Sequence, residues 1–204
     1  MTDPRAEAGW IAAWRELGVA PPAGLHAALL AAWSEPQRHY HTLQHLAECL
    51  TLADELREEM AHPAEVALAL WFHDAVYDVR AHDNEARSAQ WAAQALNEAG
   101  VAPDACARID AMIMATCHGA AASPGTPDNA LLVDIDLAIL GSEESRFAEY
   151  EAQIRAEYAW VPADVFRVKR REVLRGFLDR ARIYTTDTMV ARFEAQARRN
   201  LAQA

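Results

Sequence analysis

Cysteine, long apolar runs and an amino-terminal signal segment are scarce or absent in this sequence. Its 204 residues contain three cysteines, Cys49, Cys106 and Cys117, and no CxxC pair. We therefore expect reduced, buried thiols rather than a disulfide framework. No uncharged apolar run reaches the roughly 18 residues that a membrane-spanning helix needs. The first residues, MTDPRAEAGW, are charged and have no apolar signal core, so we expect a cytoplasmic protein.

Two families of catalytic motif are also missing. No glycine-rich loop of the kind that cradles phosphates is present, which disfavours a nucleotide-binding loop enzyme. No GxSxG or other nucleophile signature occurs, which disfavours a covalent serine or cysteine route.

Positive charge is short over most of the chain. The formal net charge is −11, with 9 basic and 25 acidic residues in 1–163, and 10 basic and 5 acidic residues in 164–204. An acidic surface repels the nucleic-acid backbone, so we expect no nucleic-acid binding. The basic carboxyl-terminal segment can still bring one or two arginines to a small anionic molecule.

The apolar residues that are present recur at spacings of three and four, and alternation of period two is almost absent. We therefore predict an all-α protein: a single domain over residues 1–204 with nine or ten helices. The expected helices cover residues 10–17, 25–33, 41–60, 63–77, 85–99, 103–116, 129–140, 142–154, 162–178 and 189–197. Ser142 is the expected N-cap of the eighth helix.

Histidine is concentrated near the end of the first fifth of the chain, in the run RHYHTLQH at residues 38–45. His41 and His45 are four residues apart, so on a helix they share one face. Two histidines at this spacing are more often ordinary surface or core residues than metal ligands.

A histidine–aspartate doublet, His73-Asp74, follows the apolar run LALWF. An isolated buried carboxylate is costly and must be paired or metal-bound. The alternative is that the doublet caps the end of its helix and hydrogen-bonds to neighbours.

Two carboxylates, Asp134 and Asp136, interrupt the run LLVDIDLAIL, which is apolar on every side and should be central. They lie about 200° apart on a helical wheel, so they face different ways. The alternative to a ligand role is a buried salt bridge to arginine.

Together these patterns supply two imidazoles and two carboxylates from three helices, a mixed nitrogen and oxygen set that suits zinc or another divalent transition ion. The arrangement resembles the HD-domain superfamily of metal-dependent phosphohydrolases, and more closely a group of small bacterial predicted HD phosphohydrolases. The resemblance covers about residues 36–200. Its five ordered segments are residues 38–45, 72–77, 84–89, 134–141 and 171–184.

The resemblance implies an HD-type helical bundle with one divalent ion per chain (Mn, Co, Ni, Fe, Mg or Zn). Its implied ligands are His45, His73, Asp74 and Asp136. Asp136 is preferred over Asp134 because the family's closing motif is an acid followed by an aliphatic pair. Asp134 would then contact a metal ligand rather than the metal itself, a role that often orients a ligating histidine.

Further roles follow from the same resemblance. The run Tyr40-His41-Thr42 resembles the start of a cyclic-nucleotide phosphodiesterase motif in which the first histidine protonates the leaving oxygen. This implies that His41 is a general acid, with Thr42 in the place of an asparagine. Glu85 is a candidate water-orienting base or second-ion ligand, and its alternative is an acid favourable to the start of its helix.

Two residues are candidates for substrate binding. Arg38 can grip phosphate oxygens in a two-pronged manner, and its alternative is a surface ion pair with Glu35. His118 is either a group in the substrate pocket or a cap at the end of the sixth helix.

We therefore expect a metal-dependent phosphohydrolase that acts on a phosphate ester or anhydride of a small molecule or nucleotide, with a homo-oligomer compatible with the sequence. Two alternatives stay open. One is a non-catalytic sensor that keeps the fold and binds a nucleotide or metal. The other is a di-iron oxygenase on the same bundle, which needs additional histidine or aspartate ligands.

Overall fold

All regular structure in the described residues, which are 3, 4, 7–117 and 125–203 of this computed structural model, is helical. The prediction of an all-α protein is therefore confirmed for this part of the chain. The α-helices are α1 Glu7–Glu16, α2 Leu25–Ala32, α3 Leu43–Glu55, α4 Pro63–Phe72, α5 Asn84–Ala99, α6 Pro103–Ala115, α7 Pro127–Asp136, α8 Glu144–Glu157, α9 Ala163–Leu178, α10 Asp187–Met189 and α11 Ala195–Gln203.

The helices form two compact units, Met1–Val133 and Asp134–Ala204, and the boundary falls within α7. We call them unit 1 and unit 2. The prediction of one domain over residues 1–204 stays a prediction. Among the described residues, no helix combines the length and the apolar character needed to cross a membrane.

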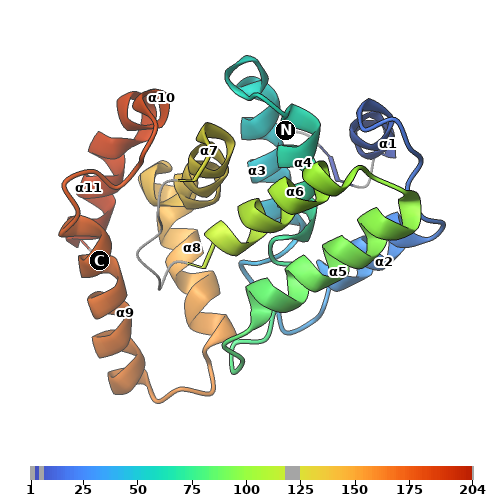
Figure 1. Cartoon of the computed structure of the whole chain (residues 1–204). Helices are drawn as coiled ribbons and strands as arrows, with labels where there is room; N and C mark the ends of the chain where they lie inside the picture. Colours follow the sequence, from blue (N-terminus) through green and yellow to red (C-terminus); the bar gives the residue numbers. More distant parts are fainter. Residues whose placement is uncertain (1–2, 5–6, 118–124, 204) are drawn as a thin grey trace. The chain divides into compact units, whose positions relative to one another are not determined.

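Helix α4 is the centre of unit 1, where α1, α3, α5 and α6 all pack against it. Its sequence PAEVALALWF explains this position, because apolar residues cover every side of the helix and eight of its ten residues are buried. Helices α5 and α6 lie side by side (Figure 1). The chain turns between them at Gly100, whose φ of 77° is a left-handed conformation that glycine adopts without strain.

Tryptophan rings attach the first two helices to α4. The ring centroids of Trp10 and Trp71 are 5.1 Å apart in an edge-to-face arrangement. The indole N–H of Trp33, just after α2, donates to the Trp71 carbonyl at 3.0 Å. A buried indole needs such a partner, so this bond defines how the end of α2 approaches α4.

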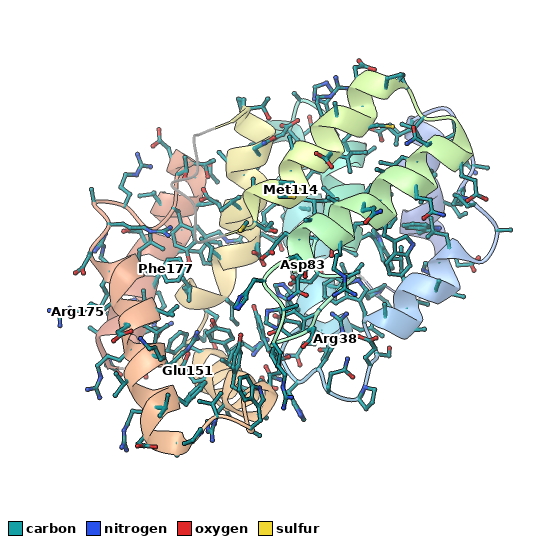
Figure 2. All side chains as sticks on the ribbon, turned by 60° about the horizontal axis from the view of Figure 1, so that its bottom comes forward. Arg38, Asp83, Met114, Glu151, Arg175 and Phe177 are labelled. Carbon is teal, nitrogen blue, oxygen red and sulfur yellow. The ribbon has the colours of Figure 1, made fainter. Side chains whose placement is uncertain are left out.

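In unit 2, α11 packs against α9 and against the 3₁₀-helix η2 (Leu137–Gly141), which follows α7 directly. Asn200 on α11 donates to the carbonyls of Leu140 at 2.9 Å and Ser142 at 2.8 Å. Phe177 on α9 is buried, whereas Arg175 is exposed and extends away from the same helix (Figure 2). This is the pattern of an amphipathic helix with one apolar stripe.

Several predicted helix ends were wrong. The third helix begins at Leu43 rather than residue 41, and the seventh ends at Asp136 before η2. Glu143, not Ser142, precedes α8 as its N-cap. The last helix is interrupted by a π-helical turn, η3 Val190–Glu194. The fourth helix was predicted to extend to residue 77, but α4 ends at Phe72, directly before the histidine–aspartate doublet.

Candidate metal centre

The chain leaves the helical path directly after α4, at the histidine–aspartate doublet. A further helical turn would pair the N–H of Val76 with the carbonyl of Phe72. Instead the N–H of Ala75 takes that carbonyl at 2.9 Å, and the N–H of Val76 donates to the Ser88 hydroxyl at 3.1 Å. His73 and Asp74 therefore begin a turn, residues 73–78, that we call the HD turn.

Three of the four predicted ligands converge within unit 1. His45 Nε2 lies 3.3 Å from His73 Nε2. Asp74 Oδ2 lies 3.2 Å from His73 Nε2 and 3.9 Å from His45 Nε2. Ligand atoms around one ion with bonds of about 2.1 Å are separated by roughly 3.0–3.4 Å. The three atoms therefore fit a single divalent ion with little adjustment.

The hydrogen bonds of His73 leave the correct nitrogen available for a metal. Its Nδ1 lies 2.8 Å from the carbonyl of Leu70, which can only accept, so we assign the proton to Nδ1. Nε2 then carries the lone pair and faces His45 and Asp74. Such a bond from the distal nitrogen is the usual arrangement behind a metal-bound histidine.

The candidate centre is enclosed on the imidazole side and open on the carboxylate side. His45 and His73 have exposed fractions of 2% and 1%, whereas the side chains of Asp74 and His41 are 17% and 18% exposed. The rings of Tyr40 and Trp33 pack near His45, with centroids at 4.7 and 6.2 Å. A substrate would therefore approach from the side of Asp74 and His41.

His41 lies beside this group, although it precedes α3. Its Nε2 is 3.9 Å from Asp74 Oδ2, and its ring stacks on Tyr77 with centroids 4.0 Å apart. Thr42, the residue in the expected asparagine position, is the N-cap of α3, and its hydroxyl accepts from the N–H of Gln44 at 3.3 Å. The cap starts the helix that carries His45, so His41 and His45 approach the centre from a loop and a helix.

Arg38 does not have the free guanidinium that a phosphate grip needs. Its Nε donates to Glu35 at 3.0 Å, and its terminal nitrogens donate to the carbonyls of His41 (3.3 Å), Asp74 (2.7 Å) and Ala75 (3.0 Å). Four of the five donors are thus engaged in a fully buried side chain. The alternative, an ion pair with Glu35, is what the geometry shows, although the arginine is buried rather than at the surface.

Asp134 and Asp136 belong to unit 2 and differ in their surroundings. The Asp134 carboxylate is buried and accepts from the N–H of Thr185 at 2.8 Å, and from the N–H and hydroxyl of Thr186 at 2.7 Å each. Burial raises its pKa, and these bonds act in the opposite direction. These contacts are with threonines, so the expected role of orienting a histidine ligand finds no support. The role of Asp136, the last residue of α7, as the fourth ligand stays a prediction.

The remaining two candidates have less to connect them with the centre. Glu85 is half-buried in the first turn of α5, where an acid is favourable to the helix dipole. Its catalytic role stays a prediction. His118 lies outside the described residues.

Three residues near the centre had no role in the sequence-based hypothesis. The buried thiol of Cys49 lies 3.7 Å from His45 Nδ1, Tyr77 stacks on His41, and Ser88 bonds to the backbone of the HD turn. Cys49 follows His45 by one helical turn, so helical spacing alone could have placed them together. Ser88 lies in the segment at 84–89 that contributed to the resemblance.

The chain matches no protein-family model, no curated protein and no solved structure in the three comparisons made.

Proposed function

We propose that this chain is a metal-dependent phosphohydrolase in which His45, His73, Asp74 and Asp136 hold one divalent ion. The observation that carries the proposal is the convergence of His45 Nε2, His73 Nε2 and Asp74 Oδ2 in unit 1. Asp136 enters on the strength of its sequence pattern. The hydrogen bonds that the Asp134 carboxylate accepts from Thr185 and Thr186 argue against Asp134 as the ligand in its place.

An ion bound by these groups would supply a nucleophilic water at neutral pH and polarise a phosphoryl oxygen. The protein would contribute the other parts of the reaction. The protonated His41 imidazole gives its Nε2 proton to the leaving oxygen, as a general acid. Asp74 Oδ2 lies 3.9 Å from that nitrogen. The imidazoles of His45 and His73 are buried, whereas the carboxylate of Asp74 is partly exposed, so the substrate approaches from the side of Asp74.

A phosphate ester fits this arrangement better than a redox substrate does. Within the described residues of unit 1, the converging ligand atoms come from two histidines and one aspartate, enough for a single ion when a carboxylate is added. A di-iron oxygenase needs a second set of ligands. We accordingly propose hydrolysis of a phosphomonoester, phosphodiester or pyrophosphate, with a phosphorylated small molecule or nucleotide as substrate.

The test is a phosphate-release screen on purified, metal-depleted protein. Mn, Co, Ni, Fe, Mg and Zn are added separately, and bis-(p-nitrophenyl) phosphate, p-nitrophenyl phosphate and a panel of phosphorylated metabolites and nucleotides are supplied. We expect turnover with at least one metal and one substrate, and none after His73→Ala.

A second histidine–aspartate pair provides the matched control. His62 Nδ1 lies 3.1 Å from Asp128 Oδ2, also in unit 1, but among the described residues no second imidazole joins this pair. His62→Ala should keep the activity. Activity that survives His73→Ala, or an absence of turnover with every metal and substrate class, would overturn the proposed function.

A further inference from the structure

Side chains from other segments bind the backbone along the HD turn. The carbonyl of Asp74 accepts from Arg38 at 2.7 Å, and that of Ala75 accepts from Arg38 at 3.0 Å. The N–H of Val76 donates to the Ser88 hydroxyl at 3.1 Å, and this hydroxyl donates back to the Val76 carbonyl at 3.4 Å.

The same pattern continues at the end of the turn. The N–H of Asp78 donates to Asn84 Oδ1 at 3.1 Å, and the Asn84 amide donates to the Asp78 carbonyl at 2.9 Å. Arg38 precedes α3, whereas Asn84 and Ser88 lie on α5. The backbone after α4 is therefore fixed from two separate directions.

These bonds replace the backbone hydrogen bonds that a continued helix would have made. Once α4 ends at Phe72, the carbonyls of the turn that follows have no helical N–H to bond them, and a buried carbonyl without a partner is costly. Arg38 satisfies two such carbonyls with charge-assisted bonds, which are stronger than neutral ones. The carboxylate of Asp74 faces His45 and His73.

Arg38 also binds the backbone of His41, the expected general acid. One of its terminal nitrogens donates to the carbonyl of His41 as well as to that of Asp74. Its guanidinium carbon lies 5.5 Å from the centre of the Tyr77 ring, which also stacks on His41. One buried cation thus connects the backbone of the expected general acid to the backbone of an expected ligand.

We infer that Arg38 is a positioning residue, which sets the place of Asp74 and His41 relative to each other and does not contact the substrate. The meaning of this role for catalysis rests on the proposed function, but its effect on the HD turn does not. Asn84 and Ser88 support the same turn from α5.

Arg38→Met and Arg38→Lys test the inference, with Arg108→Met as the matched control. Arg108 is a partly buried arginine of unit 1, and two of its bonds, at 2.6 and 2.7 Å, join α6 to Glu65 on α4. Both arginines contribute to packing. Only Arg38 contacts the HD turn.

Hydrogen exchange of the segment 73–78, measured by mass spectrometry, is the readout that needs neither metal nor substrate. We expect faster exchange of this segment in Arg38→Met and an unchanged rate in Arg108→Met. Arg38→Lys keeps the charge but loses the planar fork, so it should fall between wild type and Arg38→Met. Wild-type exchange of the segment in both Arg38 variants would overturn the inference.

Metal affinity and kinetics separate positioning from general stability. Arg38→Met should weaken Mn²⁺ binding by roughly 10- to 100-fold, as loss of an outer partner of a metal ligand does, and should lower kcat more than it raises KM. Arg108→Met should leave both unchanged. A rise in KM alone would mean that Arg38 contacts phosphate, and this would also overturn the inference.

The two proposals can fail separately. Wild-type protein that binds no metal, combined with loosened exchange in Arg38→Met, refutes the proposed function and leaves the positioning of the turn intact. If Arg38→Met does not fold, Arg38→Lys and Ser88→Ala provide the same exchange measurement. Both should then show faster exchange at 73–78, and unchanged exchange in both would refute the inference.

Discussion

The HD turn of unit 1 and the loop at residues 183–186 of unit 2 are both fixed by bonds between side chains and backbone, but in opposite senses. The opposite senses are those of the charged side chains. In the HD turn, the cation Arg38 donates to the carbonyls of Asp74 and Ala75. In the loop, carboxylates accept from backbone N–H groups: Glu194 from those of Ile183 and Tyr184, and Asp134 from those of Thr185 and Thr186.

The difference separates Asp134 from Asp74 as candidate metal ligands. The carboxylate oxygens of Asp134 accept hydrogen bonds from the loop, so this side chain stabilises the fold of unit 2. Asp74 has its backbone held by Arg38, and its carboxylate faces two imidazoles. A carboxylate that already accepts from backbone N–H groups is therefore a weaker ligand candidate than one that faces two imidazoles.

The largest effect that the comparison predicts is at Asp74. Asp74→Ala should abolish metal binding and activity, because it removes one of the three ligand atoms that converge among the described residues of unit 1 while leaving the bonds of Arg38 to the backbone intact. Metal content after dialysis, measured by mass spectrometry, checks this. A full equivalent of tightly bound metal in the variant would show that Asp74 is not a ligand.

His41→Ala should retain its metal and lose roughly 100- to 10,000-fold in turnover, the usual contribution of a general acid. The loss should be large for an alkyl phosphate and small for a nitrophenyl ester, whose leaving group hardly needs a proton. Equal losses on both substrates would mean that His41 orients the phosphate. Loss of the metal itself would make it a ligand.

The two acids around the end of α7 should separate cleanly. Asp136→Asn should weaken metal binding by more than about 100-fold, beyond the range of residues that only support a ligand. Asp134→Ala should leave metal affinity unchanged but lower the free energy of unfolding, by about 1–3 kcal/mol for the lost bonds of Thr185 and Thr186 to a charged group. Urea unfolding in a chelator measures the second effect. The reverse assignment would contradict the comparison.

The least local effect should be that of metal removal on the stability of the fold. An ion that binds only the folded chain, at about 100 times its dissociation constant, raises the free energy of unfolding by about 2.7 kcal/mol. We expect a chelator to lower the melting temperature of the wild type but not that of His73→Ala. An equal shift in both proteins would place the stabilising ion elsewhere.

Sequence periodicity predicted most of the helices because the apolar positions that bury a helix recur every three to four residues. It could not predict where α4 ends, because Arg38, Asn84 and Ser88 decide this from positions distant in sequence. Motif order placed His45, His73 and Asp74 together correctly. Motif order did not predict that the guanidinium of Arg38 donates to backbone carbonyls, since residue type alone does not reveal which donors are already bonded.

The most direct test of the central claim is the metal stoichiometry of the wild-type chain, compared with that of the His45→Ala, His73→Ala and His62→Ala variants. Each protein is stripped, reloaded with Mn²⁺, passed over a desalting column and analysed for metal per chain. The account predicts one ion in the wild type and in His62→Ala, and none in the His45 and His73 variants. Two ions per wild-type chain, none at all, or an ion retained without His45 and His73 would contradict it.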